Sequence, residues 1–231
     1  MIKSLFGAAA ITLVLLAQPA LADDISAGKI VSFTADDGTT LSGVWRGASD
    51  HVVVLSHQYD IDQSGWDPLV GLLDQAGYAT LTYNFRGYPP SGGDPVISEL
   101  QRDLDAAVAY AREQGATHIA LVGASMGGIA TVPAAVTLQP DAYVTISAPV
   151  GFAGLDATDE ALQASTAPKL FINSEGDAAA ADTRHMAEVA AEPKAVSFYP
   201  SSLHGMRIFS TKSGPKLLDE IVSFIEANMP L

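Results

Sequence analysis

Ser125 is the centre of the motif Gly123-Ala124-Ser125-Met126-Gly127, in which a serine has a glycine two residues away on each side. The apolar run Ile119 to Val122 precedes the motif, and a helical pattern begins at Gly128. This order predicts a sharp turn from a strand into a helix that exposes the serine hydroxyl as a nucleophile. Glycines are expected at 123 and 127 because side chains there would clash where strand and helix pass each other.

Met126, the first residue of the expected helix, has a backbone N–H without an intrahelical acceptor. Such an N–H can bind the negative charge that develops when the serine attacks a carbonyl, so Met126 is a candidate oxyanion donor. The alternative is a glycine-rich turn that only begins a structural helix. The strand before the motif and the helix after it favour the catalytic interpretation.

A serine hydroxyl needs a base to remove its proton, and a histidine later in the chain is the usual base after such a turn. Of the five histidines, only His185 and His204 follow Ser125. His185 lies within an expected helix, whereas His204 lies in a loop just after the last expected strand. We therefore predict His204 as the base.

An acid that orients the histidine is expected on the loop after the strand at residues 169–173. This loop contains Glu175 and Asp177, and Asp182 follows a few residues later. Glu175 is close to the strand end, and Asp182 belongs to the next expected helix. Asp177, just after Gly176, is the predicted acid of a Ser125–His204–Asp177 triad.

Short apolar strands alternate with helical stretches along the chain, which predicts an α/β fold with a mainly parallel, doubly wound sheet of about eight strands. An Asp-Gly turn at residues 36–38 joins the first two strands into a hairpin. The expected strands are 29–35, 39–46, 51–56, 79–84, 118–123, 142–147, 169–173 and 195–199. The expected helices are 66–75, 97–113, 126–138, about 179–191 and about 215–228, with a short one near 156–165.

The interval 148–168 between the sixth and seventh expected strands has room for one short helix and no separate cap domain. Ser125 is therefore expected in an open, shallow cleft.

The chain from residue 23 to 231 resembles the α/β-hydrolase family, and most of all its compact, capless esterases and dienelactone-hydrolase-like members. The segment Val52 to Tyr59 is similar to the strand and His-Gly-x oxyanion segment of that family, and Tyr83–Gly87 with Ser91–Gly93 is similar to its D-x-R-G-x-G-x-S-G loop. The resemblance implies hydrolysis of an ester or thioester through an acyl-serine. It also implies that the backbone N–H groups of Tyr59 and Met126 form the oxyanion hole, as in cutinase-like polyesterases.

The chain departs from the family pattern at two positions. Gln58 replaces the usual glycine. A residue with a Cβ restricts the backbone conformation at this position, which affects whether the neighbouring N–H of Tyr59 can serve as the second oxyanion donor. Asn84 replaces the usual aspartate, a change that mainly affects how the following loop is supported. His57 precedes Ser125 and is expected to bond loop backbone rather than to act in catalysis, and Arg86 is expected in an ion pair that fixes its loop.

The first 22 residues have the pattern of a secretory signal peptide: Lys3, an apolar run from Leu5 to Ala17, and the small-x-small site Ala20-Leu21-Ala22. The apolar run is shorter than a bilayer span, so we expect cleavage after Ala22, export to the periplasm or outside the cell, and no membrane span after processing. The chain has no cysteine.

A formal net charge of −14 disfavours binding to nucleic acid. No motif indicates a metal or another cofactor. The expected substrate is a small-molecule or surface-presented ester. A peptidase or lactone hydrolase that uses the same triad, and a binding protein that kept the fold without catalysis, are the alternatives.

Overall fold

A computed structural model gives the structure of residues 28–231. The predicted signal peptide, residues 1–22, lies outside the described residues. Within residues 28–231, none of the helices is long and apolar enough to cross a membrane.

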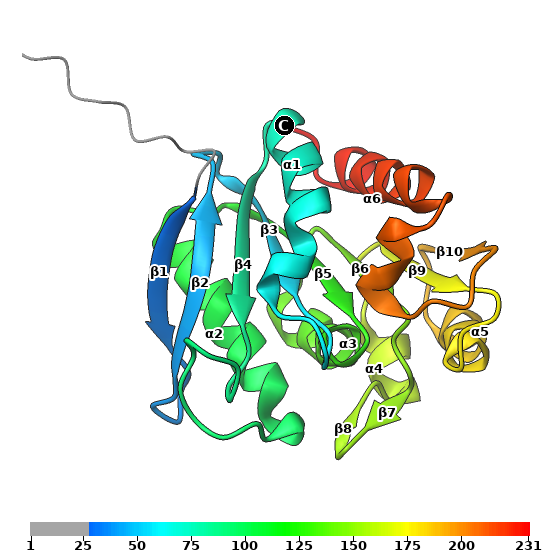
Figure 1. Ribbon diagram of the computed structural model, residues 1–231, viewed down its shortest axis with the longest axis horizontal. Helices are drawn as coiled ribbons and strands as arrows, with labels where there is room; N and C mark the ends of the chain where they lie inside the picture. Colours follow the sequence, from blue (N-terminus) through cyan, green and yellow to red (C-terminus); the bar gives the residue numbers. More distant parts are fainter. Residues whose placement is uncertain (1–27) are drawn as a thin grey trace, which may run out of the picture.

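Eight strands form one sheet across the whole molecule (Figure 1). They are β1 (Lys29–Thr34), β2 (Thr40–Arg46), β3 (His51–Ser56), β4 (Ala79–Asn84), β5 (His118–Ala124), β6 (Ala142–Ile146), β9 (Lys169–Ser174) and β10 (Lys194–Tyr199). Their spatial order is β1-β2-β4-β3-β5-β6-β9-β10. The pairs β1–β2 and β2–β4 are antiparallel, and all other neighbours are parallel.

The central strands β3, β4, β5, β6 and β9 are buried along nearly their whole length because helices cover both faces of the sheet. The α-helices of residues 28–231 are α1 (Asp67–Gln75), α2 (Leu100–Glu113), α3 (Met126–Leu138), α4 (Asp159–Ala164), α5 (Ala180–Val189) and α6 (Gly214–Asn228). Buried side chains of α2, α3, α4 and α5 form one core with one face of the sheet. Those of α1 and α6 form a second core on the opposite face.

The predicted fold class is confirmed, and each expected strand and helix has a counterpart. The structure adds a short hairpin that the sequence analysis did not predict, formed by β7 (Gly151–Phe152) and β8 (Leu155–Asp156). This hairpin and α4 fill the interval 148–168, and the described residues contain no cap domain in it. Three short 3-10 helices, η1 (Gln63–Trp66), η2 (Ile97–Glu99) and η3 (Gly205–Ser210), lie in the loops.

Arg86 fixes the loop after β4, as the sequence predicts. Its Nη2 and Nε atoms lie 2.7 and 2.9 Å from Oδ1 of Asp103, which is fully buried in α2, and its Nη1 lies 2.8 Å from Oδ2 of Asp37. Asn84 supports the same region, because its Nδ2 donates to the carbonyl of Pro89 at 2.7 Å. Both side chains thus hold loop backbone.

His57 is fully buried in the loop after β3 and bonds backbone on both ring nitrogens, again as expected. Nδ1 lies 2.7 Å from the carbonyl of Gln58, and Nε2 accepts the N–H of Phe85 at 3.0 Å. This pattern requires a neutral ring with its proton on Nδ1. Burial accordingly lowers the pKa of His57 from 6.5 to about 4.

The depressed pKa of His57 predicts a loss of stability in acid. Between pH 6.5 and 4 the unfolded chain binds a proton at His57 that the folded chain does not, so the free energy of unfolding falls as the pH falls through this window. The expected loss from this one group is about 3 kcal/mol between pH 7 and pH 4. Urea unfolding of the wild type and of His57→Gln across this range measures it. A stability difference between the two proteins that does not change with pH would contradict the assignment.

Candidate active site

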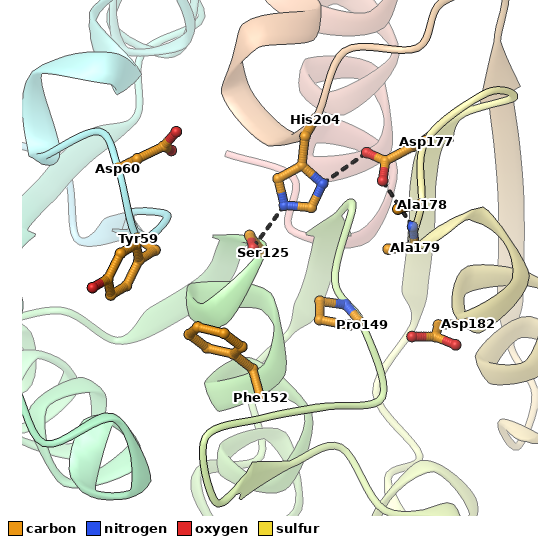
Figure 2. Close-up of a pocket in the computed structure, with 10 residues that line it drawn as sticks. All are labelled: Tyr59, Asp60, Ser125, Pro149, Phe152, Asp177, Ala178, Ala179, Asp182 and His204. Carbon is orange, nitrogen blue, oxygen red and sulfur yellow. Dashed lines mark hydrogen bonds and ion pairs between the residues drawn. The ribbon is translucent and has the colours of Figure 1, made fainter.

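Three loops that follow parallel strands meet at one edge of the sheet (Figure 2). Ser125 follows β5, Asp177 follows β9 and His204 follows β10. Because the carboxyl ends of parallel strands lie at the same edge, residues far apart in the sequence come together there.

Ser125 has φ 49° and ψ −117°, an unfavourable backbone conformation for a residue with a side chain. The glycines around it are required by close packing. A Cβ on Gly127 would lie 2.3 Å from the carbonyl oxygen of Ser56 in β3, and one on Gly123 would lie 2.3 Å from the carbonyl oxygen of Gly127. Strand β5, helix α3 and the end of β3 therefore meet backbone to backbone and hold Ser125 in its strained turn.

The structure brings the three predicted residues into one line of hydrogen bonds. His204 Nε2 lies 2.7 Å from Ser125 Oγ, and His204 Nδ1 lies 2.7 Å from Asp177 Oδ2. A neutral His204 with its proton on Nδ1 donates to Asp177 and can accept the serine proton on Nε2. The Asp177 side chain is 2% exposed, whereas that of His204 is 37% exposed and open to a substrate.

Asp177 is held by its own loop. Its Oδ1 accepts the backbone N–H of Ala179 at 2.8 Å, which leaves Oδ2 aimed at His204. The competing residues are placed differently: Glu175 is exposed, and Asp182 lies in α5 and accepts the N–H of Val150 at 3.2 Å. His185 pairs with Asp159 at 2.7 Å on the surface.

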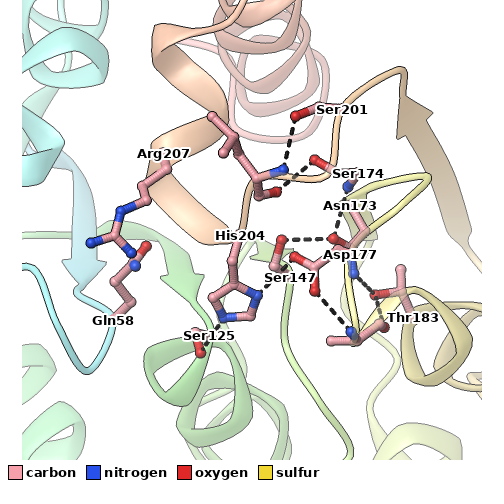
Figure 3. Close-up of polar contacts among 12 residues, drawn as sticks. Gln58, Ser125, Ser147, Asn173, Ser174, Asp177, Thr183, Ser201, His204 and Arg207 are labelled. Carbon is pink, nitrogen blue, oxygen red and sulfur yellow. Dashed lines mark hydrogen bonds and ion pairs between the residues drawn. The ribbon is translucent and has the colours of Figure 1, made fainter.

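A buried polar cluster below Asp177 was not found by sequence reasoning. Asn173, fully buried at the end of β9, accepts the hydroxyl of Ser147 at 2.7 Å and donates to the hydroxyl of Thr183 at 2.9 Å (Figure 3). These bonds join β6, β9 and α5 beneath the acid. An asparagine directly after the apolar run Leu170 to Ile172 was the available signal, since a buried amide needs partners.

Residues 200–207, which we call the base loop, carry His204 between fixed points. Ser174 Oγ donates to the carbonyl of Leu203 at 2.7 Å, just before His204. On the other side of His204, the N–H of Met206 donates to Oε1 of Gln58 at 2.7 Å. The sequence indicated only that Gln58 restricts the backbone, and it did not predict this contact with the base loop.

The two predicted oxyanion donors belong to Met126 and Tyr59. Met126 is the first residue of α3, and Tyr59 lines the same cavity as Ser125. In the part of the chain that the structure describes, neither backbone N–H donates to a protein acceptor. The non-glycine residues with positive φ in that part are Ser125, Gln139, Ser147 and Ala153. Gln58 is thus accommodated without a left-handed backbone.

A cavity of about 430 Å³ opens beside Ser125. Figure 2 shows Tyr59 and Phe152 on one side of the serine and His204 with Asp177 on the other. Phe152 comes from the β7–β8 hairpin, is 42% exposed, and meets the ring of Tyr59 edge to face at 5.8 Å. The cavity is lined by Tyr59, Asp60, Ser125, Pro149, Phe152, Asp177, Ala178, Ala179, Asp182 and His204.

Across residues 28–231, no three histidine, aspartate or glutamate side chains gather in a way that could hold a metal ion.

Comparisons with known proteins agree with this architecture. Residues 41–221 match the model of the alpha/beta hydrolase family. No curated protein sequence matches the chain. An esterase from Pyrococcus furiosus is similar in structure, with a TM-score of 0.78, 18% identity, and 93% of this chain and 96% of that chain covered.

Two further solved structures have the same fold. Est1E from Butyrivibrio proteoclasticus, solved with ferulic acid bound, gives a TM-score of 0.75 at 14% identity and covers 86% of this chain and 99% of its own. A monoacylglycerol lipase from Paleococcus ferrophilus gives 0.72 at 16% identity and covers 81% and 99%. Because the family model matches residues 41–221, most of the sequence, this chain belongs to the α/β-hydrolase family.

Proposed function

We propose that this protein is an exported serine hydrolase that cleaves a carboxylic ester or thioester through an acyl-serine intermediate. The observation that carries the proposal is the unbroken line of hydrogen bonds from Ser125 through His204 to Asp177 at the wall of an accessible cavity. Nucleophile, base and orienting acid are thus within bonding distance before any substrate binds.

Acylation begins when Ser125 Oγ attacks the carbonyl carbon and its proton moves to His204 Nε2. The N–H groups of Met126 and Tyr59 are the candidate donors to the oxyanion that forms. Asp177, nearly fully buried, stabilises the imidazolium and keeps its orientation. His204 then gives the proton to the departing alcohol or thiol, which leaves the acyl group on Ser125.

Deacylation repeats these steps with water in place of the serine. His204 takes a proton from a water molecule, the hydroxide attacks the acyl carbon, and the proton returns to Ser125 Oγ as the acid leaves. The exposure of His204 supports this step because water can reach Nε2 once the alcohol has left.

A peptidase or lactone hydrolase would use the same triad, and the site geometry by itself does not separate these bonds. The ester is favoured because the similar solved structures include an esterase and a monoacylglycerol lipase. A non-catalytic binding protein is the second class of function. It has no need for a strained serine hydrogen-bonded to a histidine, since such strain is retained where it serves chemistry.

Variants of the three residues test the catalytic unit. Ser125→Ala and His204→Ala should each lower kcat on a good ester about 10³-fold or more, with little further loss in the double variant. Asp177→Asn should cost about as much, because the amide can keep its oxygen on the N–H of Ala179 and turn its NH2 group to His204 Nδ1, which favours the wrong imidazole tautomer. Steady-state kinetics and labelling with a fluorophosphonate probe measure these effects.

Glu175→Gln and Asp182→Asn are the matched controls for the acid. Because Glu175 is exposed, Glu175→Gln should leave kcat unchanged. The assignment of Asp177 fails if Asp177→Asn keeps wild-type activity while Asp182→Asn is inactive.

The open cavity predicts a preference for short acyl chains. The interval 148–168 covers the cavity only with the short β7–β8 hairpin. A long acyl chain would therefore bury little of its surface and gain little binding energy. We expect kcat/KM to be higher for acetyl and butyryl p-nitrophenyl esters than for palmitoyl esters, with no rate increase at a lipid interface. An optimum at long chains, or a jump in rate when micelles form, would contradict an open site.

Export is part of the proposal and has its own test. Expression of the full chain in a bacterium should give a periplasmic or extracellular protein whose first residue is Asp23, as read by N-terminal sequencing. Ala22→Asp should leave an uncleaved precursor, because the residue before the cleavage site must be small. A wild-type protein that keeps residues 1–22 and stays in the membrane would show that the segment is an anchor.

A further inference from the structure

Gln58 is a buried glutamine at the edge of the active site. It lies between His57 and Tyr59 in the loop after β3 and is 1% exposed. Burial of a primary amide is favourable only if its donor and acceptor atoms find partners, so the contacts of this side chain indicate what it does.

Both ends of the Gln58 amide are used. Oε1 accepts the N–H of Met206 at 2.7 Å, two residues after His204. Nε2 donates to Oδ1 of Asp60 at 2.5 Å, within the loop after β3. The side chain therefore joins the loop of the candidate oxyanion donor Tyr59 to the base loop of His204.

The base loop is shaped to receive this amide. Gly205 has φ +58°, and a Cβ at that position would lie 2.1 Å from Gln58 Oε1. A larger residue would have to push the amide away, so the backbone just after His204 packs directly on Gln58. Outside this buried contact, Asp60 pairs with Arg207 of the base loop on the surface.

We propose that Gln58 is a positioning residue that sets the placement of His204 relative to the Tyr59 N–H. This inference rests on the proposed hydrolase function. Without the amide, the N–H of Met206 loses its buried acceptor, and the base loop is held less tightly against the loop after β3, where the surface pair of Asp60 and Arg207 remains. Displacement of a catalytic group by about 1 Å can cost on the order of 10²-fold in rate. Substrate binding at the cavity walls is less affected.

Gln58→Met tests the inference, because it keeps the length of the side chain and removes both hydrogen bonds. We expect kcat to fall about 10- to 100-fold while KM changes less than about threefold. The matched control is Gln63→Met, since Gln63 Oε1 accepts the hydroxyl of Thr82 at 3.1 Å and so serves a different part of the molecule. The control should lose stability without the loss of kcat.

A rescue experiment separates positioning from simple loss of packing. Gln58→Glu keeps the acceptor for Met206 but places a carboxylate against Asp60, so kcat should fall. Adding Asp60→Asn restores a donor opposite the new acceptor at the wild-type net charge, so kcat should recover in part, since the same change weakens the ion pair of residue 60 with Arg207. The inference is overturned if Gln58→Met keeps kcat within twofold of wild type, or if the double variant is no better than Gln58→Glu.

Hydrogen exchange gives a readout that does not need activity. In Gln58→Met, amide exchange in residues 203–209 should be faster than in wild type and in Gln63→Met, because the Met206 N–H has lost its acceptor. Unchanged exchange would overturn the inference even in an active enzyme. Failure of the wild type to react with any ester or fluorophosphonate would instead overturn the proposed function.

Discussion

The backbone contact between the turn at Ser125 and the end of β3 is the constraint on which the site depends. Gly127 lies so close to the carbonyl oxygens of Ser56 and His57 that a single methyl group would separate them. This approach fixes the strained serine and the first turn of α3 against the loop that carries Tyr59. Local strain of this kind persists only where surrounding structure holds it in place, and here three backbone segments do so.

Buried polar side chains extend that constraint to the other loops. His57 ties the end of β3 to the end of β4, Asn173 ties β9 to β6 and α5, and Gln58 reaches the base loop. Each is satisfied on both its donor and its acceptor side, which rigidifies loops that would otherwise be the mobile part of the fold. The site is therefore preorganised by hydrogen bonds between loops, while the apolar cores hold the sheet and helices beneath it.

The sequence predicts the scaffold well because each signal is local. Alternating apolar strands and helical patterns, the Asp-Gly turn before Thr39 and the glycines around Ser125 all act within a few residues. The positions of His204 and Asp177 follow from the order of elements along the chain. The pairing of Gln58 with Met206 could not be predicted, since it joins residues 148 positions apart through loops without a regular pattern. The β7–β8 hairpin was missed because its strands are only two residues long.

The central claim is that Ser125 becomes acylated during turnover, and rapid-quench mass spectrometry tests it most directly. Wild-type protein mixed with p-nitrophenyl acetate and quenched in acid should carry one acetyl group on the peptide that contains Ser125, formed together with a burst of nitrophenol. His204→Ala should form this adduct far more slowly, although its serine is still present. An active protein without an acyl group on Ser125, or with the acyl group on another residue, would contradict the account.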